Sequence, residues 1–443
     1  MLKNLLTLLL LFISMSTSYT KDYKFFPFKT HEVVLENGFK AILIPVGNSG
    51  LVSYYSVVRT GSRDEWEEGK SGFAHFFEHM MFRGTDRFPG NVYDSIITSI
   101  GANANAYTSD DLTVYHLNFA SDNLALVMDL ESDRFRNLKY SKEQFQTESG
   151  AVYGEYRKGR TSPWSVAVEE LREMAFDKHT YKHTTIGFER DIKDMPNLYD
   201  YSVSFYNRYY RPSNVTLVVV GDFDVEKTKE LVTKYYTPWK PGYTEPKIEK
   251  EPAQTAPRFR QVNYDGKTLP LVIVGFKTDE FRAKDKNFVS TISFADLAFG
   301  ETSDIYKKLV LNEQKVQFIS ANPGMNRDPY MFEIYTMIKD EKDIDYVTGE
   351  INKVIETYKS TKVEQDKLER LKKQKKYSFL MALDSPDAVA SMLPQYITLA
   401  NNIDVIDDLT ETMMNLSPDD IQKAVKLYFT ENNRNTVVLK GTK

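Results

Sequence analysis

Runs of apolar residues, some alternating and some continuous, predict a chain of mixed strands and helices. The apolar segments 33–35 and 41–44 flank Glu36-Asn37-Gly38, a strong signal for a β-hairpin. Residues 52–58 predict another strand, and residues 104–119 have the β-branched and aromatic composition of extended chain. The continuous apolar run at 216–220 predicts a buried strand.

Helical patterns alternate with these strands. Ser141 and Gln144 fit a capping box at the start of one helix, and Gly159 lies just past its end. Gly84 closes an earlier helical stretch in the manner of a C-terminal cap. The first half is therefore expected to hold helices over 66–83, 96–100, 122–135, 141–158 and 224–236.

A proline-rich segment at 238–257 lacks apolar periodicity and predicts a linker. Strand and helix patterns resume after it, with strands near 271–274, 316–321 and 330–338 and helices over 285–299 and 301–313. The last strand pattern, 436–439, echoes 216–220, which favours two similar halves. We expect the α+β class: two homologous α/β-roll domains, 24–237 and 258–443, each an antiparallel-rich sheet with helices packed on one face.

The N-terminus has the pattern of an export signal. Lys3 precedes an apolar run from Leu5 to Ile13, and the small residues 16–18 follow it. The run is too short to span a bilayer, and no cysteine is present to carry a lipid. We expect a signal peptide over residues 1–20, no stable membrane anchor, and a periplasmic or secreted protein.

Composition narrows the choice of chemistry and partners. The 443 residues carry a net charge of −5 without long basic or acidic runs, which argues against nucleic acid or an anionic membrane surface as a partner. The chain has no cysteine, so it forms no disulfide and has no thiol nucleophile. Any zinc ion must be held by histidine and carboxylate side chains.

The pentapeptide His75-Phe76-Phe77-Glu78-His79 is the most informative motif. Histidines four apart lie about 400° around a helix, so they project from one face and suit two ligands of a tetrahedral zinc ion. Glu78 can reach a water on the metal rather than the metal itself. The order H-x-x-E-H is the inverzincin signature. The alternative is an amphipathic helix with packed histidines.

A catalytic zinc needs a third protein ligand and an open position. Glu148 and Glu155 are candidates, because residues seven apart lie within about 20° on one helical face. Gly150 and Gly154 weaken that helix, which predicts a close approach of its backbone to the motif helix.

These residues resemble the insulinase/pitrilysin-type zinc metallopeptidases, which include the mitochondrial processing peptidase. Members carry H-x-x-E-H and, some 70–80 residues later, two glutamates seven apart. Asn105-Ala106-Tyr107-Thr108 is similar to the family's substrate-edge strand, and 211–214 with Gly221-Asp222 is similar to its domain-closing strand. The matches span roughly 30–235.

The resemblance implies roles for seven residues. One Zn²⁺ per chain would be bound by His75, His79 and Glu155. Glu78 would act as the general base, and Glu148 would orient a ligand histidine. Asn105 and Ala106 would bind a peptide substrate through their backbone as an added strand. A solvated carboxylate at 148 and an ordinary hairpin edge at 105–106 are the alternatives. His31, His116, His179 and His183 are expected to be structural.

The chain departs from the family in its second half. Single-chain members place an Arg and a Tyr seven apart there, to stabilise the tetrahedral intermediate. Val310 stands at the Arg position and Gln317 or Phe318 at the Tyr position. Arg327, Tyr330 and Tyr335 lie downstream at other spacings, and we expect surface roles for them.

This departure bears on partners and function. The chain also covers two of the four units of the long members. Both features resemble the two-subunit branch and imply a homologous partner that supplies the missing Arg/Tyr pair. The expected function is a secreted zinc-dependent endopeptidase that hydrolyses peptides or unfolded segments as the catalytic subunit of a heterodimer. A non-catalytic assembly subunit and a metal-dependent hydrolase of another substrate are the alternatives.

Overall fold

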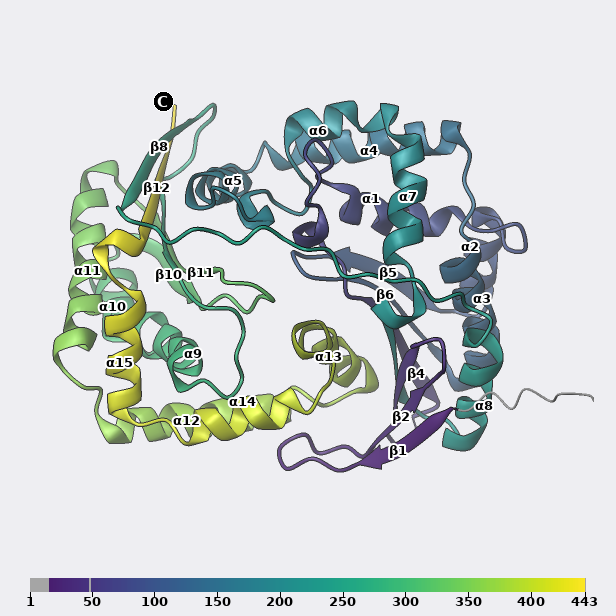
Figure 1. The fold of residues 1–443 in the computed structure, drawn as a ribbon. Helices are drawn as coiled ribbons and strands as arrows, with labels where there is room; N and C mark the ends of the chain where they lie inside the picture. The colour runs from purple at the N-terminus through teal and green to yellow at the C-terminus, as the bar shows by residue number, and fades with distance from the viewer. Residues whose placement is uncertain (1–15, 48, 443) are drawn as a thin grey trace, which may run out of the picture.

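Two β-sheets and their covering helices make up the computed structural model, which describes residues 16–47 and 49–442 (Figure 1). The predicted signal peptide therefore lies mostly outside the described residues. Its last residues fall in β1, Thr17–Lys21, which pairs with the next strand. None of the helices in the described part of the chain has the length and apolar character of a membrane span.

The first sheet has seven strands in the order β1-β2-β3-β7-β4-β6-β5. Only the β3–β7 pair is parallel among the pairs described, and the others are antiparallel. After β1, the strands are β2 (Thr30–Val34), β3 (Lys40–Pro45), β4 (Leu51–Val58), β5 (Asn103–Thr108), β6 (Thr113–Ala120) and β7 (Val215–Gly221). The predicted hairpin is confirmed as β2 and β3, with Gly38 in a left-handed turn at φ 88°.

The second sheet repeats this arrangement. Its order is β10-β11-β9-β12-β8, again with one parallel pair, β8–β12. Read from the parallel pair outward, β8-β12-β9-β11-β10 matches β3-β7-β4-β6-β5 strand for strand. The strands are β8 (Arg258–Tyr264), β9 (Leu271–Lys277), β10 (Val316–Asn322), β11 (Met331–Ile338) and β12 (Arg434–Gly441). The predicted α+β class with two similar halves is confirmed.

Helices of each half cover one face of their own sheet. In the first half, these helices pack with the side chains of Ala41, Leu43 and Leu217, and in the second with Val272, Val274 and Val438. The first-half helices are α1 (Phe73–Met80), α2 (Gly90–Ser99), α3 (Leu124–Asn137), α4 (Lys142–Gly159), α5 (Pro163–Ala175), α6 (Glu189–Asp194), α7 (Tyr199–Tyr209) and α8 (Val225–Tyr236). Those of the second half are α9 (Lys286–Phe299), α10 (Asp304–Tyr306), α11 (Ile344–Ser360), α12 (Gln365–Met381), α13 (Pro386–Ala400), α14 (Val405–Met414) and α15 (Pro418–Tyr428).

The opposite face of each sheet is covered by a helix from the other half. Helix α13 packs on β4 and β7 of the first sheet, where Val389 and Leu393 meet Val218 and Val220. Helix α5 packs on β8, β9 and β12 of the second sheet. Figure 1 shows α13 between the two sheets. Because both faces are covered, β7 is buried at every position and β4 at every position after Leu51, rather than at alternate ones. The predicted one-sided packing is thus completed by a helix exchange that the sequence did not indicate.

Other boundaries differ from the prediction. The helix expected from residue 66 starts at Phe73, because residues 66–72 form turns that end at Gly72 with φ 94°. The helix expected over 301–313 is a short turn, α10, followed by π-helical residues Lys307–Asn312. Strand β8 and helices α5 to α7 were not predicted.

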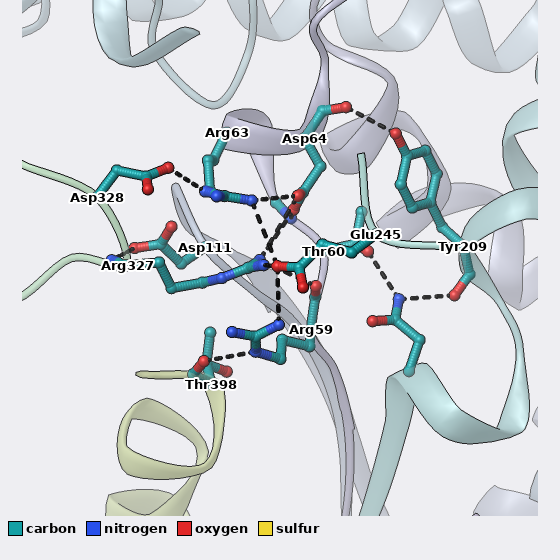
Figure 2. Close-up of polar contacts among 12 residues, drawn as sticks. Arg59, Thr60, Arg63, Asp64, Asp111, Tyr209, Glu245, Arg327, Asp328 and Thr398 are labelled. Atoms are coloured by element: carbon teal, nitrogen blue, oxygen red, sulfur yellow. Dashed lines mark hydrogen bonds and ion pairs between the residues drawn. The ribbon is translucent and has the colours of Figure 1, made fainter. Parts of the chain in front are cut away.

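Buried charges join the two halves where the segment 238–257 crosses between them (Figure 2). The Arg327 side chain is only 2% exposed and lies 3.4 Å from Asp64 Oδ2, and it also pairs with Glu245. Arg63 Nε donates to Asp328 Oδ2 at 2.6 Å. The predicted surface role of Arg327 is wrong, since its partners belong to the other half and to the crossing segment.

That segment contains no helix or strand, and it is held in place. Glu251 accepts backbone N–H bonds from Asp177, Lys178 and His179 and pairs with Lys277 at 2.7 Å. Tyr330 is also buried, against the prediction, and stacks on Phe176 of the first half. The division at 238–257 stays a prediction about sequence domains, because the exchanged helices cross it.

Candidate active site

Helix α1 presents the motif from a buried position. The Glu65 carboxylate accepts the N–H groups of Gly72 at 2.7 Å and Ala74 at 2.6 Å, which satisfies free donors at the start of the helix. One face of α1 is fully buried in the core of the first half. The opposite face carries the three polar residues of the motif, as the four-residue spacing of its histidines requires. The buried residues are Phe73, Ala74, Phe76, Phe77 and Met80.

Helix α4 brings a carboxylate to the two histidines. Glu155 Oε2 lies 3.4 Å from His75 Nε2 and 3.5 Å from His79 Nε2. One ligand atom of each residue lies within 4.8 Å of the other two. Two imidazole nitrogens and a carboxylate oxygen are a typical donor set for a catalytic zinc, so the residues present fit this ion.

The glycines of α4 do not act as the sequence suggested. A Cβ atom built on Gly150 or Gly154 meets nothing within 4 Å. The predicted close approach of the α4 backbone at these glycines is therefore wrong. The start of α4 does match its prediction, since Ser141 and Gln144 form a reciprocal capping box.

Glu148 lies behind the histidines and fixes one of them. Its Oε1 atom lies 2.8 Å from His79 Nδ1, which leaves His79 Nε2 directed at Glu155. Its other oxygen pairs with Arg83. The hydrogen bond between His79 Nδ1 and Glu148 Oε1 raises the pKa of His79. Burial works to raise the pKa of Glu148, but the bonds from His79 and Arg83 outweigh it and hold that pKa below its usual value.

His75 is held in its neutral form. Burial, followed by the proximity of His79, lowers the pKa of His75 to about 4. A neutral imidazole has the free lone pair that a metal ligand needs. Its Nδ1 atom is buried and has no hydrogen-bond partner among the described residues.

Glu78 faces the same space with one oxygen anchored. Its Oε2 atom accepts a hydrogen bond from Thr108 Oγ1 at 2.7 Å, at the end of β5. Burial raises the pKa of Glu78 despite this bond, and nearby Glu155 raises it further. A carboxylate with a raised pKa is a better proton acceptor near neutral pH than an exposed glutamate.

The predicted substrate residues lie on the edge strand β5. This strand ends the first sheet, next to β6, so one of its sides has no strand partner in the described sheet. Asn105 is exposed, and its Oδ1 atom accepts the Ala106 N–H at 2.9 Å. An amide side chain thus satisfies a backbone donor of this edge strand.

The other four histidines take no part in this cluster. His179 caps a short 3₁₀ turn and bonds Asp328 at 3.0 Å. His183 is buried with its Nδ1 atom 3.0 Å from a backbone carbonyl. His116 stacks on Tyr55, and His31 lies 3.1 Å from Thr20. These contacts agree with the expected structural roles.

The second half supplies no Arg/Tyr pair at the positions that the resemblance indicates. Val310 is half-buried in the π-helical turn, Gln317 is exposed on β10, and Phe318 is half-buried beside it. Two residues of the site were not singled out from the sequence. Arg83 could have been found, because it lies four residues after His79 within the helix predicted over 66–83, although the structure places it in a 3₁₀ turn. Thr108 needs the fold, since its hydroxyl reaches across to another element.

Comparison with known sequences defines the class. A sequence model described as insulinase (peptidase family M16) matches residues 51–188, and one described as peptidase M16 inactive domain matches residues 199–375. The zinc protease PqqE of Helicobacter pylori is 29% identical over 419 residues, covering 93% of both chains. A probable mitochondrial-processing peptidase subunit beta of Arabidopsis thaliana is 24% identical over 349 residues, which is 75% of this chain and 64% of that one.

Comparison with solved structures agrees with the sequence matches. A protease from Helicobacter pylori superimposes with a TM-score of 0.87 at 26% identity, covering 95% of this chain and 100% of that chain. The periplasmic protease PqqL from Escherichia coli shares the fold, with a TM-score of 0.78 at 19% identity over 95% of this chain and 48% of that chain. The fold and these sequence matches define the class of protein, whose named relatives include zinc proteases. It belongs to the insulinase family, peptidase family M16.

Proposed function

We propose that this chain is an exported zinc-dependent endopeptidase that hydrolyses peptides or unfolded polypeptide segments. The observation that supports it best is the convergence of His75, His79 and Glu155 from two helices, with Glu78 beside them. The motif order, the neutral His75 and the family membership all favour the same chemistry.

His75, His79 and Glu155 would hold one zinc ion per chain. When bound, zinc lowers the pKa of a coordinated water towards about 7 and polarises the peptide carbonyl. Glu148 keeps His79 oriented through the Nδ1 atom, so that Nε2 remains available. Arg83 neutralises Glu148 from the other side.

Glu78 is the proton acceptor in this proposal. Thr108 occupies its Oε2 atom, so Oε1 is the atom that takes the proton of the attacking water. The same oxygen then delivers the proton to the leaving amine, which regenerates the carboxylate. The raised pKa of Glu78 suits both transfers near neutral pH.

A peptide substrate would bind along β5 as an added strand. In this proposal the pair Asn105 and Ala106 binds the added strand on the free side of β5, where the Ala106 N–H lies. The Asn105 side chain must release the Ala106 N–H for that donor to reach a substrate carbonyl. An extended or unfolded segment has free backbone groups and can add a strand to β5, whereas a folded domain has its backbone groups already paired.

The experiment that tests this function is metal analysis combined with peptide cleavage. The wild-type protein should contain about one zinc per chain, lose cleavage with a chelator and regain it with added zinc. Glu155→Gln should lose both bound zinc and cleavage. Cleavage that survives chelation, or that is unaffected by Glu155→Gln, would rule the proposal out.

A partner subunit is part of the proposal. The positions of the expected Arg and Tyr hold Val310 and Gln317 or Phe318, none of which supplies the positive charge of an arginine or the hydroxyl of a tyrosine. The Arabidopsis relative is named a subunit, and so is a mouse relative, cytochrome b-c1 complex subunit 1. We expect a heterodimer with a homologous chain that supplies the missing pair. Full activity of the isolated monomer in size-exclusion fractions would contradict this.

Export to the periplasm or outside is supported by the N-terminal pattern and by the Escherichia coli relative, which is named a periplasmic protease. N-terminal sequencing of the mature protein would test the signal peptide over 1–20. The division into domains 24–237 and 258–443 is also a proposal, and it is supported by the proline-rich pattern at 238–257.

A non-catalytic assembly subunit is the second candidate. Its support is the missing Arg/Tyr pair and the match of residues 199–375 to a model described as an inactive domain. The presence of Glu78 favours catalysis, because a purely structural zinc site has no use for a proton acceptor.

A further inference from the structure

A cavity of about 420 Å³ lies between the N-terminal segment and the helices of the second half. Its walls come from the turn between β1 and β2, from α9, α12, α13 and α14, and from the loop between β10 and β11. The candidate active-site residues are not among those that line it. Small-molecule sites have volumes of about 300–1,000 Å³, so the cavity is large enough for a ligand.

Most of the wall is apolar and belongs to the margins of two different cores. Ile292, Leu409 and Met413 pack against the core of the second half. Phe379 and Tyr396 pack against the core that α13 forms with the first sheet. The cavity is therefore the space that remains where these two cores meet.

The N-terminal side of the wall is fixed in place. Asp407 of α14 accepts the backbone N–H of Lys24 at 2.5 Å and that of Phe25 at 2.8 Å. The Lys24 ammonium also pairs with Glu411 of α14 at 2.9 Å. Because these bonds already order the segment, a ligand does not have to order it in order to bind.

The ionisable groups of the wall, apart from a tyrosine, are all lysines. Lys24, Lys375 and Lys376 line the cavity, and no aspartate or glutamate lines it with them. Lys24 and Lys375 pair with carboxylates outside the wall, and both pairs are partly exposed and therefore weak. Lys376 forms no ion pair with any described residue, and its ammonium lies 6.0 Å from the centre of the Phe25 ring.

A hydroxyl group of the wall also lacks a partner. The Tyr396 hydroxyl makes no hydrogen bond to any residue that the structure describes, and burial raises the pKa of this side chain. The hydroxyl is therefore protonated at neutral pH and can donate a hydrogen bond. The wall thus combines apolar surface with ammonium groups and a free donor.

From the apolar walls, the lysines without an acidic neighbour in the wall and the unpartnered Tyr396 hydroxyl, we infer that this cavity binds a single-chain amphipathic anion, such as a fatty acid. The alkyl chain occupies the space between the two cores, and the carboxylate lies with the exposed Lys376. A lysine side chain suits this place, because its stem adds apolar wall while its ammonium stays in water. The inference is independent of the proposed peptidase function, since no candidate catalytic residue takes part.

The test is a calorimetric titration of the purified protein with dodecanoate, below the concentration at which it forms micelles. Binding should saturate near about one dodecanoate per chain, with the negative heat-capacity change that burial of apolar surface produces. Decanoate should bind about tenfold more weakly, because two fewer methylene groups are buried. Absence of dodecanoate binding, or equal affinities for acetate and dodecanoate, would overturn the inference.

The head group is tested with one ligand and two variants. Dodecyltrimethylammonium should bind about tenfold or more weakly than dodecanoate, because its cationic head meets the lysines. Lys376→Glu should weaken dodecanoate binding about tenfold and leave the binding of decanol unchanged. Lys373→Glu makes the same change of charge at an exposed position of α12 outside the wall and is the matched control. Equal dodecanoate affinities in the two variants would refute the role of Lys376.

A third variant fills the cavity. Met413→Trp adds bulk to the wall and should weaken dodecanoate binding about tenfold or more, because fewer methylene groups fit. Met414→Trp places the same side chain at the next position, outside the wall, and should bind as wild type does. Lys376→Glu covers the case in which Met413→Trp does not fold, because Lys376 is exposed. Unchanged affinity in a folded Met413→Trp protein would rule the cavity out as the site.

A lipid surface is the competing source of the same chemistry. The end of α12 exposes Tyr377 and Met381, at 61% and 78%, and Leu380 between them lines the cavity. Binding of dodecanoate without sedimentation on phosphatidylglycerol vesicles supports the cavity site. Sedimentation with these vesicles and no binding of dodecanoate would replace it with attachment to a membrane through this end of α12.

Discussion

The two halves of the chain share a sheet order but differ in the residues at one helix contact. This contact joins α1 and α4 in the first half and α9 and α12 in the second. Helix α9 follows β9 as α1 follows β4, and α12 precedes the exchanged helix α13 as α4 precedes α5. Counted from their N-caps, Leu371 and Ser378 of α12 stand where α4 has Glu148 and Glu155. Helix α9 contains no histidine or glutamate.

The packing of these helices is otherwise alike. Phe145 of α4 and Leu368 of α12 stand at the same distance from the N-cap, and both are fully buried. The second half therefore forms a stable crossing without buried histidines or carboxylates. Burying such groups costs free energy unless they are paired. The first half keeps His75 neutral and Glu78 at a raised pKa at this place, which supports a chemical rather than a structural reason for them.

The largest expected effect comes from the proton acceptor. Glu78→Gln should lower kcat about 10²- to 10⁴-fold, because it removes general-base catalysis and keeps the shape of the side chain. Bound zinc, measured by metal analysis, should stay at the wild-type level. Asp296→Asn in α9 is the control: it loses only an exposed pair with Lys375 and should keep full activity. Unchanged cleavage by Glu78→Gln would remove the functional contrast between the halves.

We expect the ion pairs of Arg327 with Asp64 and Glu245, which join the two halves, to contribute to the stability of the fold. Arg327→Met leaves Asp64 and Glu245 without this buried partner, and we expect a loss of about 3–5 kcal/mol in the free energy of unfolding. Chemical denaturation measures it. Arg282→Met, at an exposed pair, should change stability by about 0–1 kcal/mol. Equal effects of the two variants would argue against the network as a link between the halves.

His75 predicts a pH dependence that belongs to the first half alone. Its folded pKa of about 4 lies below the unfolded value near 6.5. The unfolded chain therefore binds a proton first, and zinc-free protein should lose up to about 3 kcal/mol of stability as pH falls from 6.5 to 4. In His75→Gln, the loss of unfolding free energy that His75 causes at low pH should vanish. His183, whose pKa is also lowered, contributes equally in the variant and in the wild type. Parallel denaturation curves across this pH range would contradict the prediction.

The smallest effect is expected at Glu148. Glu148→Gln keeps an acceptor for His79 Nδ1 but loses the charge, so zinc affinity should fall about 10- to 100-fold. Competition with a chelating dye measures this affinity. The counterpart Leu371→Gln perturbs the second-half core without touching the site, and its zinc affinity should equal that of wild type. A similar loss in both variants would point to global destabilisation instead.

Local patterns predicted the strands well and the covering helices poorly. Turn chemistry at Glu36-Asn37-Gly38 and the apolar run at 216–220 act over a few residues, so both could be inferred. The run shows that a strand is buried, but not which helix covers it, and α13 comes from the far half. Arg327 illustrates the same limit: Asp64 is 263 residues away along the chain, and no periodicity reveals such a contact.

The candidate site also contains parts that the sequence predicts and parts that only the fold reveals. The four-residue spacing of His75 and His79 and the seven-residue spacing of the glutamates follow from helix geometry. Their meeting follows from the packing of α1 on α4, which only the family resemblance suggested. Trp164 packs edge-on against Tyr335 of the other half, and the sequence contains no signal for that pair.

The helix exchange also sets an order for folding during synthesis. The face of the first sheet that carries Ile42, Tyr55 and Val218 is complete once residue 221 is made, but its cover ends at residue 400. At about 5–20 residues per second, roughly 10–35 s separate these events on the ribosome. For that time the nascent first half holds an apolar sheet face that only the segment around Phe26 can cover. A truncated chain ending at the crossing segment would keep this face permanently, and aggregation rather than an isolated catalytic domain is its expected fate.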